Sequence, residues 1–309
     1  MAINKALRAA LKALSYPELD VKKNYRMERE WVNLTSKRVV KPHLKQILDR
    51  SVMCADHTVP VRIFTPPEYA GHRVLVFFHG GGWVTGNIDS YDGVCADMAS
   101  MTGQMVISVD YRLAPEHPFP AGLEDCYAAA REVCLGGSLL PFCPEAEEVT
   151  IIGDSAGGNL AAAVSLMARD RGEFLPKRQI LIYPATAADH SESSPFASIR
   201  ENGTGYLLTA KRICDYMEIY RSSEADLANP YFAPLEETNY CDQPDTLIIT
   251  AQYCPLRDEG EEYGHRLMQA GNRVMIRRIP DTLHGYFSLP VRFAPVRHTY
   301  EIINRFLKE

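Results

Sequence analysis

The sequence GDSAG at residues 153–157 is the feature that most constrains how this chain folds. It lies between an apolar, β-branched run at residues 149–152 and an Ala- and Leu-rich run at residues 159–171, which predict a strand and a helix. The glycines on either side of Ser155 allow the strand and the helix to approach closely. The pattern G-x-S-x-G in such a turn holds the serine in a strained backbone conformation with its hydroxyl exposed. Ser155 is therefore a candidate nucleophile.

Strand and helix patterns alternate along most of the chain after about residue 40. Short, continuous apolar runs are typical of central, fully buried strands. The predicted strands are residues 43–48, 59–65, 74–78, 105–109, 149–152, 180–183, 246–250 and 274–279, and the predicted helices include residues 89–103, 121–135, 159–171 and 295–307. This alternation predicts an α/β fold with a mostly parallel central sheet and helices on both faces.

Two segments do not follow the alternation, residues 1–42 and about 185–235. Both contain helical patterns, such as residues 210–220, and a structureless loop of about 50 residues is not expected in a compact domain. We therefore predict an N-terminal cap segment at residues 1–42 and a main domain at residues 43–309. A second cap insertion is predicted at about residues 185–235.

The sequence HGGGW at residues 79–83 follows the predicted strand that ends at Phe78. Three consecutive glycines allow backbone N–H groups to turn toward a ligand without obstruction by a Cβ atom. Alone, the run is equally consistent with a flexible loop. Its place one strand–helix–strand–helix unit before the serine turn favours a loop that stabilises negative charge on a substrate oxygen.

A candidate general base follows the predicted strand at residues 274–279, in the sequence LHGYF at residues 283–287. A base must lie on a loop at the carboxyl edge of the sheet to reach Ser155. His284 is in such a loop and follows the serine in chain order. The other eight histidines are expected to be structural or on the surface.

Composition excludes several classes of partner. The net charge is −6 and the sequence has no basic stripe, so nucleic-acid binding is not expected. Residues 1–14 have apolar side chains at helical spacing, but Lys5, Arg8 and Lys12 interrupt them, so no signal peptide is predicted. No apolar run is long enough to span a bilayer. The eight cysteines include no C-x-x-C pair and predict free thiols in a reducing, cytoplasmic environment without a metal site.

Four motifs together resemble the hormone-sensitive-lipase-like branch of the α/β-hydrolase esterases. They are HGGGW at residues 79–83, VDYRLAPEHPFP at residues 109–120, GDSAGGNL at residues 153–160 and LHGY at residues 283–286, and the resemblance extends from about residue 59 to the C-terminus. It implies an α/β-hydrolase fold with a helical cap, with Ser155 as nucleophile and His284 as base. It also implies an oxyanion hole in which Gly80 shapes the turn and the N–H groups of Gly81, Gly82 and Ala156 are the donors. No cofactor is implied.

The chain departs from this family at the position of the catalytic acid. The family places its Asp at the start of a D-P-L-R-D-E-G segment, whereas this chain reads CPLRDEG from Cys254 to Gly260. A neutral thiol is a weak acceptor and orients an imidazole poorly. Three explanations remain open. Another carboxylate (Asp258, Glu259 or Asp281) substitutes, Cys254 acts as a thiolate beside the imidazolium, or the acid is absent and the enzyme is slow.

The resemblance implies a serine carboxylesterase for short-chain acyl esters such as acetyl esters, with activity reduced by Cys254. The alternative is a catalytically weak or silent hydrolase-fold protein that binds a ligand. The expected partner is a small-molecule ester, with no nucleic acid and no membrane. The predicted edge strand at residues 274–279 favours a homodimer. Candidate pocket-lining residues are Tyr25, Trp31, Trp83, Tyr206 and Leu207.

Overall fold

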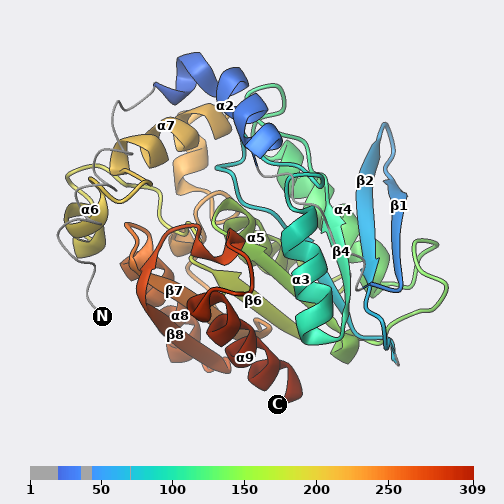
Figure 1. Ribbon diagram of the computed structural model, residues 1–309. Helices are drawn as coiled ribbons and strands as arrows, with labels where there is room; N and C mark the ends of the chain where they lie inside the picture. The colour runs from blue at the N-terminus through green and yellow to red at the C-terminus, as the bar shows by residue number, and fades with distance from the viewer. Residues whose placement is uncertain (1–19, 36–43, 70) are drawn as a thin grey trace.

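A computed structural model describes residues 20–35, 44–69 and 71–309 as an eight-stranded sheet covered by helices (Figure 1). The strands are β1 (Gln46–Met53), β2 (Thr58–Thr65), β3 (Val74–Phe78), β4 (Met105–Val109), β5 (Val149–Asp154), β6 (Arg178–Ile182), β7 (Asp245–Tyr253) and β8 (Val274–Leu283). The helices are α2 (Val21–Thr35), α3 (Asp92–Thr102), α4 (Ala121–Cys134), α5 (Ala156–Arg171), α6 (Ala197–Asn202), α7 (Ala210–Tyr220), α8 (Arg257–Gln269) and α9 (Ala294–Lys308).

The strand order in the sheet is β1-β2-β4-β3-β5-β6-β7-β8. β2 runs antiparallel to both β1 and β4, and every other neighbouring pair is parallel. The predicted α/β-hydrolase architecture with a mostly parallel sheet is therefore confirmed. The reversal of strand order around β3 and β5 creates the point at which parallel sheets of this kind bind ligands, at the carboxyl ends of the strands.

The core is centred on β3 and β5, whose residues are all buried. α3 and α9 pack against each other in front of the sheet in Figure 1, and α4 and α5 pack together behind it. α5 is almost entirely buried, which explains its run of Ala and small side chains: only these allow a helix to approach a sheet and a neighbouring helix closely.

All eight predicted strands are present, and their bounds differ most at β1 and β8. The strand predicted at residues 43–48 is β1 at Gln46–Met53, and residue 43 lies outside the described residues. β1 pairs with β2 over its whole length, so tertiary pairing rather than the local apolar pattern sets its position. The edge strand predicted at residues 274–279 continues to Leu283 and lies at the edge of the sheet as β8.

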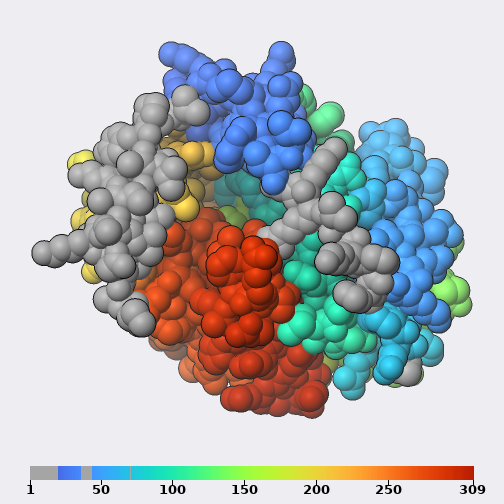
Figure 2. All heavy atoms as spheres, viewed as in Figure 1, coloured from blue at the N-terminus to red at the C-terminus, as the bar shows by residue number. Residues whose placement is uncertain are grey.

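Helices α2, α6 and α7 lie together at one end of the molecule, beyond the carboxyl ends of the strands (Figure 1). α2 contacts α7, although the two helices are far apart in the sequence. In Figure 2 the blue atoms of α2 cover the end of the molecule above the orange atoms of the C-terminal elements. Within the described residues, no helix has both the length and the apolar character needed to cross a bilayer.

Candidate active site

Ser155 lies on a tight turn between β5 and α5, where its backbone has a positive φ of 56° together with ψ of −117°. That conformation is unfavourable for a residue with a side chain, and the surrounding structure must enforce it. A Cβ atom on Gly157 would lie 2.0 Å from the carbonyl oxygen of Phe78, and a Cβ atom on Gly153 would lie 2.1 Å from that of Gly157. Only glycine fits at both positions, so β5 and α5 approach closely and Ser155 lines a pocket.

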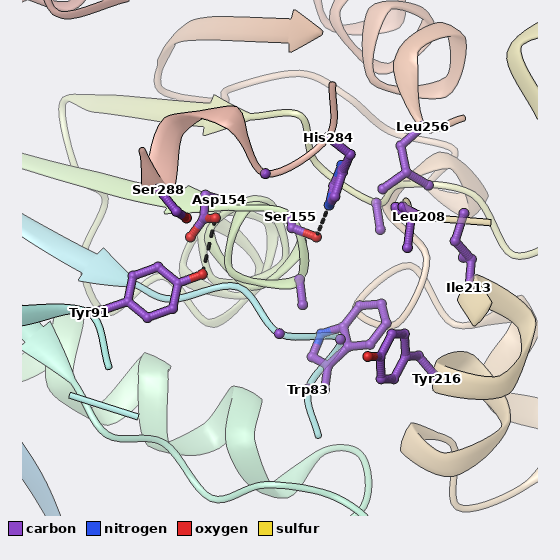
Figure 3. A pocket seen from close by; sticks show the side chains of 15 residues that line it. Trp83, Tyr91, Asp154, Ser155, Leu208, Ile213, Tyr216, Leu256, His284 and Ser288 are labelled. Carbon is purple, nitrogen blue, oxygen red and sulfur yellow. Dashed lines mark hydrogen bonds between the residues drawn. The ribbon is translucent and has the colours of Figure 1, made fainter. Parts of the chain in front are cut away.

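Strand register brings three of the predicted site residues into a row. β7 and β8 pair in parallel with Tyr253 opposite Leu283. The residues that follow, Cys254 and His284, are therefore neighbours. His284 Nε2 lies 2.8 Å from Ser155 Oγ, and the imidazole points at the hydroxyl in Figure 3. On the other side of the ring, Cys254 Sγ lies 3.1 Å from His284 Nδ1. The arrangement has the order of a catalytic triad with a thiol in the third position.

Burial sets the charge state of the Cys254–His284 pair. Cys254 has no exposed surface, and burial raises the pKa of its thiol well above the usual range. Burial also lowers the pKa of His284 to about 3. Both shifts disfavour the charged form of the residue concerned, so the pair consists of a thiol and a neutral imidazole. The alternative in which Cys254 is a thiolate beside an imidazolium is therefore disfavoured.

The acidic residues closest in sequence to Cys254 have partners of their own. Asp258 accepts a hydrogen bond of 2.7 Å from the backbone N–H of Ser198 and pairs with Arg257 at 2.7 Å. Glu259 is fully buried and accepts a hydrogen bond of 2.7 Å from the backbone N–H of Thr186. Both carboxylates fix the segments around the site and do not complete it.

The hydrogen-bond partner of His284 Nδ1 is therefore a sulfur atom. Among residues 20–35, 44–69 and 71–309, Cys254 is the only group bonded to this nitrogen. None of the three acidic residues considered as substitutes, Asp258, Glu259 and Asp281, lies there. A sequence prediction that a nearby carboxylate takes over from the family's Asp is not supported by this geometry.

The glycine loop after β3 lies beside the serine turn. Phe78, the last residue of β3, pairs with Gly153 of β5, so both loops begin at the same edge of the sheet. Gly81 and Gly82 line the pocket together with Ala156, the first residue of α5. In the described part of the chain, no hydrogen bond uses the backbone N–H groups of these three residues. They are available to an oxygen atom of a ligand, and the helix N-terminus adds partial positive charge there.

Gly80 has a different role in the loop, and it depends on a residue that sequence reasoning did not single out. The backbone N–H of Gly80 donates to Asp154 Oδ1 at 2.8 Å. Asp154 is buried, and the hydroxyls of Tyr91 and Tyr183 each donate to its Oδ2 at 3.3 Å. Gly80 therefore anchors the loop to the residue next to Ser155. The only feature of the sequence that pointed to Asp154 was its position inside the GDSAG motif.

The buried carboxylate of Asp154 is expected to make stability depend on pH. Burial raises its pKa to about 6, although the Gly80 amide and the two tyrosine hydroxyls oppose the shift. An acid whose pKa is higher in the folded than in the unfolded state loses stability as pH rises from about 4 to about 6. We expect the free energy of unfolding of the wild type, relative to Asp154→Asn, to fall by about 2 kcal/mol across this range. Urea unfolding at pH 4.5 and 6.5 measures the difference. If the free energy of unfolding changes equally with pH in the wild type and in Asp154→Asn, the prediction is contradicted.

The pocket at Ser155 has a volume of about 210 Å³. Its apolar lining consists of Trp83, Ala185, Leu208, Ile213, Tyr216 and Leu256. In Figure 3, Trp83 and Tyr216 lie across the pocket from His284. Among the residues that the structure describes, no group of three or more His, Cys, Asp or Glu side chains is arranged to hold a metal ion.

Of the five predicted lining residues, only Trp83 lines this pocket. Trp31 is 65% exposed and faces a separate groove beside Met27. Tyr206 is buried against Tyr253 with parallel rings 5.5 Å apart. Tyr25 and Leu207 are also absent from the pocket wall, and the neighbouring Leu208 is present instead. Leu207 and Leu208 lie in an irregular segment. The sequence there has no periodic pattern that would indicate which of two neighbouring side chains faces the pocket.

Comparison with known proteins agrees with this fold and site. Residues 75–288 match the model of the family described as the alpha/beta hydrolase fold. The chain belongs to the α/β-hydrolase family. This α/β hydrolase is 36% identical over 290 residues to Esterase LipI of Mycobacterium tuberculosis, covering 92% of this chain and 88% of that protein. It is 34% identical over 264 residues to an arylesterase of Saccharolobus solfataricus, covering 85% of this chain and 84% of the relative.

Solved structures give the same result. A hyperthermophilic esterase from the archaeon Pyrobaculum calidifontis superposes on this α/β hydrolase with a TM-score of 0.87 at 35% sequence identity. The match covers 100% of this chain and 98% of that esterase. The resemblance to the hormone-sensitive-lipase-like esterases is thus confirmed, and the protein is a carboxylic ester hydrolase.

Proposed function

We propose that this hydrolase is a serine carboxylesterase that cleaves short-chain acyl esters, acetyl esters among them, through an acyl-enzyme intermediate. The observation that carries the proposal is the 2.8 Å contact between Ser155 Oγ and His284 Nε2, in a pocket that the Gly81 and Gly82 backbone also lines. Nucleophile, base and amide donors at one site are the parts that acyl transfer requires.

In the first step, Ser155 Oγ attacks the ester carbonyl carbon while His284 Nε2 takes the hydroxyl proton. The carbonyl oxygen becomes an oxyanion, which the N–H groups of Gly81, Gly82 and Ala156 stabilise. The tetrahedral intermediate collapses with cleavage of the bond to the alcohol oxygen, and His284 returns the proton to that oxygen. The alcohol leaves and the acyl group stays on Ser155.

In the second step, water attacks the acyl-enzyme and His284 Nε2 takes a proton from it. The second tetrahedral intermediate collapses to the carboxylic acid, and the proton returns to Ser155 Oγ. Every proton passes through His284 Nε2, so the reaction needs the tautomer of His284 that carries its hydrogen on Nδ1. What lies beside Nδ1 therefore controls the rate of both steps.

Cys254 is a poor partner for that nitrogen, and we propose that it slows the enzyme. A thiol is a weak acceptor for the Nδ1–H group and gives little stabilisation to the imidazolium that forms in each step. A thiol is also a donor. When Cys254 donates to His284 Nδ1, the hydrogen of the neutral imidazole is on Nε2, and that tautomer cannot accept the proton of Ser155.

The size and character of the pocket support uncharged esters with small acyl groups as substrates. Leu208, Ile213 and Leu256 give the pocket an apolar wall, and its volume is about 210 Å³. Apolar walls favour binding of alkyl groups by burial. The relatives named above as esterases, and an ethyl acetate hydrolase of Pseudomonas putida that is 35% identical over 249 residues, support this class of substrate.

We further propose a cytoplasmic location and a homodimer. All eight cysteines are free thiols, which is typical of a reducing compartment. β8 is at one edge of the sheet, and edge strands favour pairing with a second copy.

Hydrolysis of p-nitrophenyl esters tests the function. We expect turnover of the acetate and butyrate esters, and a fall in kcat/KM for the octanoate and longer esters because their chains exceed the pocket. Ser155→Ala is the control for background hydrolysis. If the wild type is indistinguishable from that variant with every ester, the esterase proposal is wrong. The ligand-binding alternative is then favoured.

A further inference from the structure

The face of α7 that points toward the sheet packs directly on the glycine loop. A Cβ atom on Gly82, whose φ is 61°, would lie 2.5 Å from Cγ of Tyr216, so the tyrosine ring covers the Cα of this glycine. One turn further along α7, the ring of Tyr220 stacks on Trp83 with centroids 4.6 Å apart and an interplanar angle of 1°. Two consecutive residues of the loop are therefore held by α7.

Tyr216 is itself held by α2, through its hydroxyl. The hydroxyl donates to Glu28 Oε1 at 2.6 Å. Arg212, one turn earlier on α7, forms an ion pair with Glu28 and also donates to the Tyr216 hydroxyl at 3.2 Å. Tyr216 is 9% exposed and the Glu28 side chain is 15% exposed, so these contacts are largely shielded from water. Shielding strengthens hydrogen bonds that involve a charged group.

The residue after Glu28 contacts the other end of the same loop. Arg29 Nε donates to the carbonyl oxygen of Val84 at 2.9 Å, and its Nη2 donates to that of Ala114 at 3.0 Å. Glu28 and Arg29 thus connect one turn of α2 to both sides of the glycine loop, directly at Val84 and through Tyr216 at Gly82. Figure 1 shows α2 lying across α7 at this end of the molecule.

We propose that Glu28 and Tyr216 are positioning residues for the glycine loop, and that Glu28 acts through the Tyr216 hydroxyl. The inference rests on the proposed function, in which the Gly82 N–H stabilises the oxyanion. Gly82 has no side chain to fix its own orientation, and glycine has more conformational freedom than any other residue. The ring of Tyr216 restricts that freedom from outside the loop, and the bond to Glu28 keeps the ring in place.

Oxyanion stabilisation depends strongly on donor geometry, which makes the contact important for rate. Donors act at 2.7–3.1 Å from the oxyanion, and loss of one donor lowers kcat by about 10²–10³-fold. A displacement of about 1 Å in a supporting residue can cost about 10²-fold. The interaction acts on the transition state more than on the bound ester, so kcat rather than KM should change when it is lost.

Kinetics of three variants test the proposal: Glu28→Ala, Tyr216→Phe and the double variant. Tyr216→Phe keeps the ring that lines the pocket and removes only the hydroxyl. We expect each single variant to lower kcat for p-nitrophenyl acetate about fivefold with KM within about twofold of the wild type. The double variant should fall no further than the lower single variant, because both remove the same hydrogen bond. Glu30→Ala, a change at an exposed glutamate on the same helix, is the matched control and should retain wild-type kcat.

Amide hydrogen exchange gives a second readout that does not depend on activity. The hydrogen-bonded N–H groups of the loop are those of Gly80, Val84 and Thr85. We expect them to exchange faster in Glu28→Ala and Tyr216→Phe than in the wild type or in Glu30→Ala. Unchanged exchange, or multiplicative losses of kcat in the double variant, would overturn the proposal. If the wild type lacks esterase activity, the proposed function fails separately, and exchange alone decides whether Glu28 and Tyr216 hold the loop.

Discussion

Replacing Ser155 by alanine is expected to lower ester hydrolysis about a hundredfold, a smaller loss than in an enzyme with a complete triad. The change removes the oxygen atom that lies 2.8 Å from His284 Nε2 and leaves the glycine loop intact. Covalent catalysis then stops, and only the binding and oxyanion contributions to rate remain.

The expected size follows from the thiol at position 254. In a serine protease, loss of the nucleophile lowers kcat by about 2 × 10⁶-fold and loss of the acid alone by about 3 × 10⁴-fold. These losses are not additive because the three residues act as a unit. An enzyme that lacks the acid therefore has only about 2 × 10⁶ / 3 × 10⁴, or roughly a hundredfold, left to lose with its serine. A loss near 10⁶-fold would instead mean that Cys254 does the work of a carboxylate.

Labelling with a fluorophosphonate identifies the nucleophile without a measurement of the turnover rate. Ser155 Oγ displaces fluoride from phosphorus and forms a stable phosphonate ester, and His284 takes the proton. We expect labelling of the wild type and none of Ser155→Ala. Ser138→Ala, which changes an exposed serine, is the control and should be labelled as the wild type is. Equal labelling of Ser155→Ala would show that another residue is the nucleophile.

The residues of the catalytic row could be found in the sequence because strand register determines where they meet. Ser155 and the glycine loop follow β5 and β3, which pair with Phe78 opposite Gly153. Parallel strands place their carboxyl ends at one edge, so motifs that follow strands converge there whatever their distance in the chain. The same rule places His284 and Cys254 side by side after β8 and β7.

The wall of the pocket and the support of the glycine loop were beyond sequence reasoning for a physical reason. Tyr216 and Leu208 belong to the segment between β6 and β7, whose position depends on packing across α2 and the loop. Contacts such as Tyr216 to Glu28 join residues that no periodic pattern relates. Asp154 is a different case, since its position beside Ser155 was visible but its hydrogen bond to Gly80 was not.

Replacing Cys254 by aspartate is expected to raise kcat for p-nitrophenyl acetate at least tenfold, and at most by the roughly 10⁴-fold that an acid contributes in serine proteases. The carboxylate would stand beside His284 Nδ1, where Cys254 Sγ is now 3.1 Å away. There it accepts the Nδ1–H bond, fixes the productive tautomer and stabilises the imidazolium.

Cys254→Asn is the matched control, because asparagine has the shape of aspartate without the charge. It should stay near the wild-type rate, since a neutral amide neither stabilises the imidazolium nor enforces one tautomer. A buried aspartate can lower stability, so the thermal midpoint of each variant is measured beside its rate. A folded Cys254→Asp protein with an unchanged or lower rate would show that the position beside Nδ1 does not limit catalysis.

The pH dependence of kcat/KM in the wild type and in Cys254→Asp provides the stronger test. Burial lowers the pKa of His284 to about 3, so the wild-type base stays unprotonated and its titration should give no acid limb in kcat/KM from about pH 5 to pH 8. An adjacent carboxylate favours the charged imidazole and raises its pKa. In Cys254→Asp, kcat/KM should therefore fall on the acid side at a higher pH than in the wild type, while the rate at pH 8 rises. Both changes have one cause, the stabilisation of the imidazolium, so an increase in rate without movement of the acid limb would contradict the role assigned to position 254.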